Sequence, residues 1–112
     1  METCLFCRIA KKELPSKMAF EDDRVFVFHD INPQAPVHLL ICPQKHIASL
    51  HEVSNEDNAL VGYMFEVARK MADQFGVAKS GYRTVFNVGA DTGQTVFHVH
   101  LHVIGGRKLS WP

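Results

Sequence analysis

Three histidines alternate with apolar residues near the end of the chain, in the stretch TVFHVHLHVIGG from Thr95 to Gly106. Residues two apart in a β-strand share a face, so His98, His100 and His102 are expected on one face. Phe97, Val99, Leu101 and Val103 then point to the other face, toward a core. At about 3.3 Å per residue the outer histidines lie roughly 13 Å apart, too far for one metal ion with bonds of about 2 Å to bind all three. The three imidazoles therefore divide the work between them, or only some of them have a function.

A second set of possible ligands begins with CLFC, which places Cys4 and Cys7 three residues apart. A single C-x-x-C pair is a weak signal, because a structural zinc site needs four ligands. His46, in PQKHI, and His98 are the candidates outside the pair. Buried free thiols are the plain alternative for Cys4 and Cys7. Cys42 lies in an apolar stretch and is expected in the core.

The composition sets the context for these residues. A chain of 112 residues suits one compact domain, here residues 1–112, and its 12 basic and 12 acidic side chains cancel. This balance argues against a broad surface for nucleic acid or an anionic membrane. No apolar run reaches the roughly 20 residues of a membrane span, and the N-terminus does not resemble a signal peptide. We expect a reducing, cytoplasmic location, where the cysteines are thiols or metal ligands.

The elements that position the histidines follow from hydrophobic periodicity. Residues 4–12 predict a short helix, and a stripe from Leu60 to Phe75 predicts a long one, with Ser54 and Asp57 as a capping box and Gly76 as the stop. Strands are predicted at 24–30, 37–43, 82–89 and 95–105, with the first two and the last two forming antiparallel hairpins. The expected fold class is α+β, an antiparallel sheet of about five strands with one long and one short helix.

Longer stretches carry a resemblance to a known family. HVHLHVI resembles the signature of the histidine triad (HIT) superfamily. The stretches FEDDRVFVFHDINPQAPVHLLICPQKHI, GYRTVFNVG and GQTVFHVHLHVIGGR, with the SWP end, are similar to the histidine triad nucleotide-binding branch, the purine nucleoside phosphoramidases. This resemblance implies the HIT fold, a homodimer, and purine nucleoside monophosphate and phosphoramidate ligands at the histidine face.

The resemblance also implies hydrolysis through a covalent nucleotidyl-histidine intermediate, with His100 as the nucleophile. An imidazole with an ordinary pKa of about 6.5 is mostly neutral, and hence nucleophilic, near pH 7. His102 would stabilise charge on the phosphoryl oxygens, and His38 would support the triad from the neighbouring strand. Thr95 stands where serine is expected. Its hydroxyl can still relay a proton to the leaving amine, although its methyl group restricts the rotamer.

Nucleotide contacts follow from the same resemblance. Asp30 would accept the ribose hydroxyls, and Asn87, Gln94 and Thr95 would contact the phosphate or its surroundings. The base pocket would be lined by Phe6, Ile9, Phe28, His29 and Ile31. Core packing is the alternative for these residues, and for Ile9 it is nearly as good an interpretation. Trp111 would reach toward the partner subunit's site and shape the choice of leaving group.

In several branches of this superfamily a zinc site has the same make-up as Cys4, Cys7, His46 and His98. Zinc would then be structural, and no cofactor would be needed for catalysis. Three rival functions stay open at this point: a dinucleoside polyphosphate hydrolase, a nucleotide-binding or adaptor protein without activity, and a metalloenzyme that uses His98 and His100 as ligands.

Overall fold

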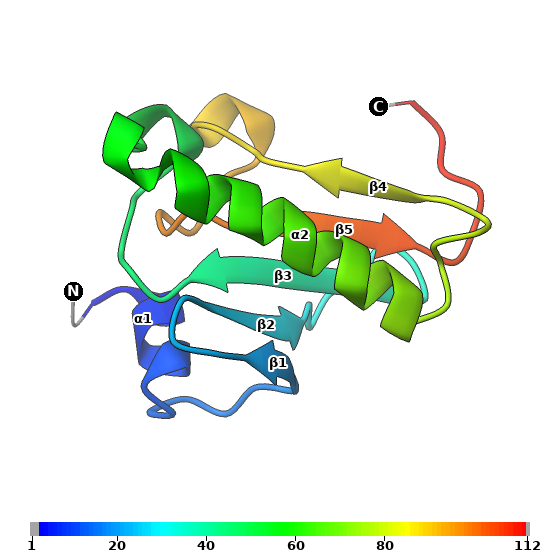
Figure 1. Ribbon diagram of the computed structural model, residues 1–112, viewed down its shortest axis with the longest axis horizontal. Helices are drawn as coiled ribbons and strands as arrows, with labels where there is room; N and C mark the ends of the chain where they lie inside the picture. Colours follow the sequence, from blue (N-terminus) through cyan, green and yellow to red (C-terminus); the bar gives the residue numbers. More distant parts are fainter. Residues whose placement is uncertain (1–2, 112) are drawn as a thin grey trace.

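The computed structural model describes residues 3–111 and contains one five-stranded antiparallel sheet with strand order β1-β2-β3-β5-β4 (Figure 1). The strands are β1 (Met18–Glu21), β2 (Val25–His29), β3 (Val37–Pro43), β4 (Tyr82–Val85) and β5 (Leu101–Gly105). The helices are α1 (Leu5–Ala10) and α2 (Asn58–Gln74), with three 3-10 turns at Leu50–Glu52, Asn55–Asp57 and Ala90–Thr92. The α+β class and both predicted hairpins are confirmed, because β2 pairs with β3 and β4 with β5.

Helix α2 forms where the apolar stripe predicts it. Its inward face buries Met64, Val67, Ala68 and Met71 against the sheet, and Gly76 ends the helix with a φ of 74°. Its start differs from the prediction. The Ser54 hydroxyl donates to the Asp57 carboxylate instead of capping a backbone N–H, and Asp57 occupies the N-cap position.

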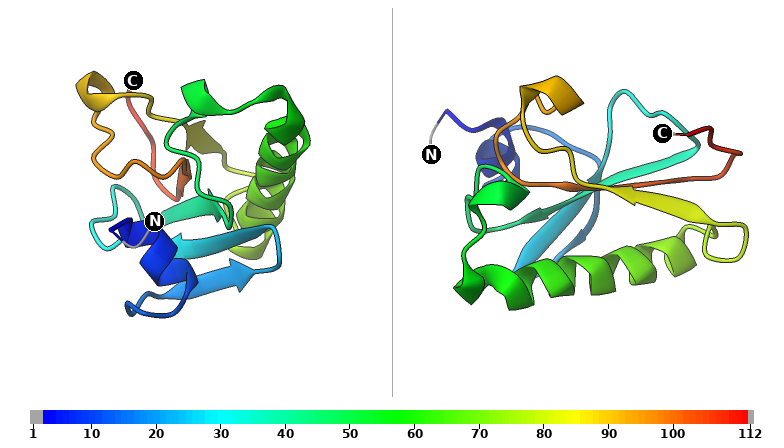
Figure 2. Two further views of the ribbon diagram at one scale, coloured as in Figure 1. Left: turned by 90° about the vertical axis from the view of Figure 1, so that its left-hand side faces the viewer. Right: turned by 90° about the horizontal axis from the view of Figure 1, so that it is seen from above.

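The sheet separates two hydrophobic clusters. Alternation along β2 sends Val25 and Val27 toward α2, and Phe26 and Phe28 toward the opposite face, where α1 packs. Seen from above, α2 covers one side of the sheet, while α1 and the 3-10 turn Ala90–Thr92 lie on the other (Figure 2). The face without α2 is therefore only partly covered, and the loops that end several strands gather there.

The histidine strand is shorter than the sequence predicts. Strand β5 begins at Leu101, and residues 94–100 are irregular, so the expected strand 95–105 is wrong in its first half. Pairing with β3 stops at Ile41, and Pro43 at the end of β3 has no N–H to continue the ladder. As a result Phe97 is 51% exposed and does not enter the core. Similarly, β4 ends at Val85 and not at residue 89, while β1 is a strand that the periodicity did not indicate.

Among the described residues, no helix combines the length and apolar character that crossing a membrane requires.

Candidate active site

A cavity with a volume of about 790 Å³ lies on the sheet face opposite α2. It is lined by residues from α1, the loop after β2, strand β3, the 3-10 turn region and the histidine segment, among them Phe6, Ile9, Phe28, Asp30, Ile31, Gln34, His38, Asn87, Thr95, His100 and His102. Apolar side chains therefore meet imidazoles and one carboxylate in a single concave site, the usual form of a small-molecule pocket.

His100 has one ring nitrogen fixed by the backbone. Its Nδ1 lies 2.7 Å from the carbonyl oxygen of His98. A carbonyl only accepts hydrogen bonds, so Nδ1 carries the proton and Nε2 keeps its lone pair. Burial lowers the pKa of His100, which keeps the imidazole neutral near pH 7. The ring of Phe6 packs edge-on against it with centroids 5.0 Å apart. His100 thus offers an unprotonated nitrogen in the tautomer that nucleophilic attack requires.

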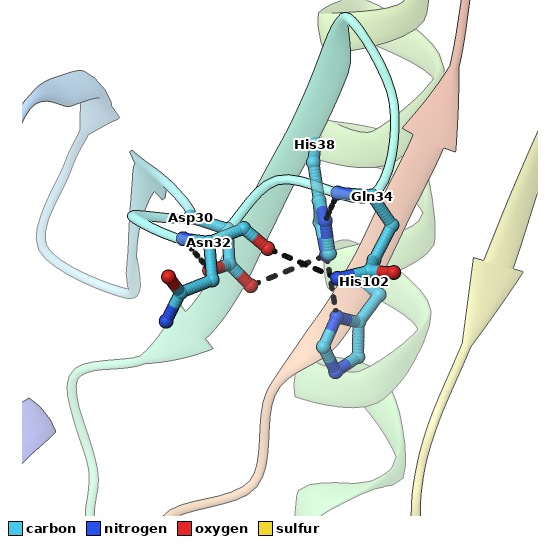
Figure 3. A network of polar contacts seen from close by, with 5 residues as sticks. All are labelled: Asp30, Asn32, Gln34, His38 and His102. Atoms are coloured by element: carbon cyan, nitrogen blue, oxygen red, sulfur yellow. Dashed lines mark hydrogen bonds and ion pairs between the residues drawn. The ribbon is translucent and has the colours of Figure 1, made fainter. Parts of the chain in front are cut away.

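A chain of hydrogen bonds orients His102 (Figure 3). The backbone N–H of Gln34 donates to Nδ1 of His38 over 3.0 Å, so the neutral His38 ring carries its proton on Nε2. That Nε2 lies 2.9 Å from Nδ1 of His102. Two N–H groups cannot face each other at this distance, so His102 accepts at Nδ1 and carries its own proton on Nε2. The backbone N–H of Gln34 therefore determines the tautomers of both His38 and His102. His102 keeps an N–H on Nε2 that can donate to a ligand.

Electrostatics agree with neutral rings in this network. Burial, and then the neighbouring His100 and His38, lower the pKa of His102 to about 4. Burial also lowers the pKa of His38, although the Asp30 carboxylate opposes the effect. Asp30, His38 and His102 lie close enough together to suggest a metal site. The proton on Nε2 of His38 argues against it, because that nitrogen has no lone pair for a cation.

A second cluster of side chains, formed by Cys4, Cys7, His46 and His98, presents ligand atoms that suit a metal ion. His98 is fully buried and its Nε2 donates to the carbonyl oxygen of Pro43 over 2.8 Å, so the lone pair is on Nδ1. This Nδ1 lies 3.4 Å from the Cys4 sulfur, 3.5 Å from the Cys7 sulfur and 3.2 Å from Nδ1 of His46. Four soft or borderline ligand atoms thus converge at one point, with the backbone hydrogen bond that typically orients a metal-binding histidine.

The spacing of these atoms fits zinc. Bonds of about 2.05 Å to nitrogen and about 2.3 Å to sulfur predict tetrahedral edges of about 3.3 Å between nitrogens and about 3.6 Å between nitrogen and sulfur. The observed separations are 3.2 Å between the two nitrogens and 3.3–3.5 Å from nitrogen to sulfur. Cys4, Cys7, His46 and His98 could therefore hold a metal ion such as zinc. Cys42, by contrast, is buried in the second hydrophobic cluster, as expected.

Apart from the predicted metal ligands Cys4, Cys7 and His46, all but four of the predicted site residues line the cavity. Gln94 is 3% exposed, and its amide binds the backbone of Gly89, Ala48 and Val96, so it braces the loop. His29 is displaced to the α2 side of the sheet, where it packs against Phe75, because it shares a strand face with Val25 and Val27. The His98 ring faces the Cys4 and Cys7 sulfurs and does not line the cavity. Trp111 is 90% exposed and lies outside the cavity lining.

Two backbone groups at the site had no signal in the sequence. The N–H of Gln34 and the carbonyl of Pro43 orient His38 and His98, respectively. Any residue except proline could supply the first, and any residue could supply the second, so side-chain motifs do not reveal them.

The comparisons with known proteins agree with this fold and site. Residues 11–109 match the HIT domain family, and the chain belongs to that family. It is 44% identical to the purine nucleoside phosphoramidase of Escherichia coli K12, over 96% of this chain and 91% of that protein. It is also 44% identical to an uncharacterized HIT-like protein of Synechocystis, over 99% of this chain and 96% of the relative.

A solved structure extends the likeness to three dimensions. The HIT family hydrolase from Clostridium thermocellum superimposes with a TM-score of 0.96 at 44% identity, over 100% of this chain and 97% of that one. At this similarity the five-stranded sheet and its long helix are those of the HIT fold.

Proposed function

We propose that this protein is a nucleotide hydrolase that cleaves the P–N bond of purine nucleoside 5′-phosphoramidates, such as AMP joined to an amine. The observation that carries the proposal is the state of His100. Its Nδ1 donates to the His98 carbonyl, which leaves the Nε2 lone pair at a cavity that also holds His102 and Asp30. The similarity to a purine nucleoside phosphoramidase supports the choice of substrate.

The proposed reaction has two steps. Nε2 of His100 attacks the α-phosphorus, the P–N bond breaks, and the departing amine takes a proton that the Thr95 hydroxyl relays from solvent water. Water then attacks the phosphorus of the nucleotidyl-histidine and releases AMP. The Nε2–H of His102 stabilises the phosphoryl oxygens in both steps. Thr95 is exposed and lines the cavity, which is consistent with this role.

The remaining contacts divide along the cavity. Asp30 accepts hydrogen bonds from the ribose hydroxyls, and Asn87 contacts the phosphate or ribose. The purine packs against four apolar side chains: Phe6, Ile9, Phe28 and Ile31. Phe6 and Phe28 pack edge to face with centroids 5.3 Å apart, which gives this end of the cavity an aromatic surface. Gln94 acts indirectly in this proposal, because its side-chain amide donates hydrogen bonds to the backbone carbonyls of Ala48 and Val96 and so holds the loop that carries Thr95.

Zinc is proposed as structural. Bound by Cys4, Cys7, His46 and His98, it would tie α1 to the sheet. The geometry argues against a metalloenzyme in which His98 and His100 share an ion. Nδ1 of His98 faces the cysteines, whereas Nδ1 of His100 is protonated and donates to the His98 carbonyl.

We also propose a homodimer, with Trp111 near the partner's site. Strand β4 is an edge of the sheet, so its outer backbone groups are free to pair with a second copy. Light scattering coupled to size-exclusion chromatography is expected to give twice the mass of the chain.

The deciding experiment measures hydrolysis of an adenosine 5′-phosphoramidate by the wild type and by His100→Ala. We expect turnover by the wild type and a loss of several orders of magnitude in kcat for the variant, with AMP binding retained. Diadenosine polyphosphate serves as the comparison substrate. Faster cleavage of that compound would favour a polyphosphate hydrolase. Equal inactivity of wild type and variant, with AMP still bound, would leave a nucleotide-binding protein without activity.

A further inference from the structure

The tautomers of His38 and His102 depend on a loop without helix or strand. Residues 30–36 join β2 to β3, and the N–H that donates to Nδ1 of His38 over 3.0 Å belongs to Gln34 in this loop (Figure 3). One proton lies between Nε2 of His38 and Nδ1 of His102, which are 2.9 Å apart. If His102 held that proton, Nδ1 of His38 would carry a proton that faces the Gln34 N–H. The Gln34 N–H therefore excludes the tautomer of His102 that has no proton on Nε2.

The carbonyl group of the same loop residue is held by Arg107. The Arg107 Nε donates to the Gln34 carbonyl oxygen over 2.8 Å, and its Nη1 donates to the carbonyl oxygen of Lys108 over 2.9 Å. Two bonds from one planar guanidinium fix its direction. Arg107 lies two residues beyond the end of β5, so this side chain connects the exit of the histidine strand to the loop before β3.

The rest of the loop is anchored on both sides of Gln34. Pro33 has a fixed φ, and Pro36 restricts the backbone of Ala35. Pro36 also packs closely against Gly106, where an added Cβ would lie 3.1 Å from the Pro36 Cβ. Between these anchors, the φ and ψ angles of Gln34 relate its N–H to its carbonyl. Gln34 is exposed, so these angles depend on the hydrogen bonds made by the two groups.

We propose that Arg107 is a positioning residue for the candidate active site. By holding the Gln34 carbonyl, it keeps the N–H of the same residue directed at His38, and His102 keeps its proton on Nε2 before any ligand binds. Arg107 is not among the residues that line the cavity, so it acts through the loop and not by touching the substrate. Its effect on turnover rests on the proposed function, in which the Nε2–H of His102 stabilises the phosphoryl oxygens. Its effect on the tautomers needs no substrate.

Two substitutions of Arg107 isolate the hydrogen bond to the loop. Arg107→Gln loses the charge but places an amide nitrogen as many bonds from Cα as the arginine Nε. Arg107→Met loses the same charge and has a methyl group there. Arg107 is exposed, so both variants should fold. For adenosine 5′-phosphoramidate we expect Arg107→Met to lower kcat by about tenfold or more at a KM within about twofold of the wild type, and Arg107→Gln to recover most of kcat. Equal kcat in the two variants would overturn the proposal.

Nitrogen-15 NMR of the imidazoles tests the same link without substrate. Long-range correlations distinguish protonated from unprotonated ring nitrogens. We expect His38 and His102 to carry their protons on Nε2 in the wild type and in Arg107→Gln, and a measurable share of His102 to carry its proton on Nδ1 in Arg107→Met. The same His102 spectrum in all three proteins would overturn the proposal, and so would a wild type protonated on Nδ1 of His102. Absence of wild-type turnover would refute the proposed function, and this NMR comparison alone would then decide whether Arg107 sets the tautomers.

Discussion

At the scale of the residue, the site depends on which imidazole nitrogen carries the proton. His98, His100 and His38 each have one nitrogen fixed by a backbone group. The other nitrogen faces the two cysteines in His98, the cavity in His100 and the His102 ring in His38. Backbone groups are rigid, so these assignments persist without a ligand. In the proposed function, the same residue type would thus supply a metal ligand at His98, a nucleophile at His100 and a donor at His102.

The lowered pKa of His102 predicts a dependence of stability on pH. Its pKa is about 4 in the folded protein and near 6.5 when unfolded, so between these values the unfolded chain binds more protons. The free energy of unfolding should therefore fall as the pH drops from 7 to 4, with a share of roughly 1 to 3 kcal/mol from this residue. Urea unfolding across this range should show a smaller fall for His102→Gln. An identical fall would mean that His102 does not contribute.

Gln94 tests whether a predicted nucleotide contact is instead a structural brace. Gln94→Leu removes the hydrogen bonds to Gly89, Ala48 and Val96 in a buried position, and should lower the free energy of unfolding by about 2 to 4 kcal/mol. The exposed Gln74 provides the matched control, and Gln74→Leu should cost less than about 0.5 kcal/mol. Chemical denaturation measures both. A loss of nucleotide affinity with an unchanged free energy of unfolding would indicate that Gln94 contacts the nucleotide.

At the scale of the element, the stability of helix α1 depends on contacts outside the helix. It has six residues, too few for a stable helix on its own, and it carries Phe6 and Ile9 to the cavity. The segment from Cys4 to Ile9 thus connects the candidate metal-binding cysteines to the wall of the pocket. Ordering of α1 by a metal would also order the aromatic surface beside His100.

Removal of zinc tests this element directly. Zinc should raise the Tm of the chelator-treated protein by about 5 °C or more, because it binds the folded state alone. Cys7→Ser should abolish most of this rise. Cys42→Ala, at a buried cysteine outside the cluster, should keep it. Differential scanning fluorimetry of the three proteins, with and without zinc, gives the comparison. An equal response of Cys7→Ser and wild type would place the metal elsewhere.

At the scale of the whole molecule, the same sheet carries the α2 core on one face and the site on the other. Met64→Ala opens a cavity under α2 and should lower the free energy of unfolding by about 2 to 5 kcal/mol. Loss of AMP binding and loss of helical circular dichroism should occur at the same urea concentration, since the two faces share strands. Phe65→Ala, next in sequence but 37% exposed, should cost much less. Separate transitions would show that the site folds independently of the core.

The sequence by itself determined the α+β class, the position of α2 and the two hairpins. It also identified His98, His100 and His102 as candidate functional residues. These features depend on local periodicity and on residue types, which one chain displays directly. The set Cys4, Cys7, His46 and His98 was expected through the resemblance to the HIT superfamily, since a single C-x-x-C pair is a weak signal by itself.

Only the tertiary structure decided the start of β5, the position of His29 on the α2 side, the inward turn of Gln94, and the tautomers of the site. Each depends on a partner far away in sequence or on a backbone group. Pro43 ends the ladder and binds His98, Ala48 takes the amide of Gln94, and Gln34 sets His38. Periodicity reports which face of an element is apolar, but it holds no record of which backbone N–H or carbonyl will lie opposite a side chain after folding.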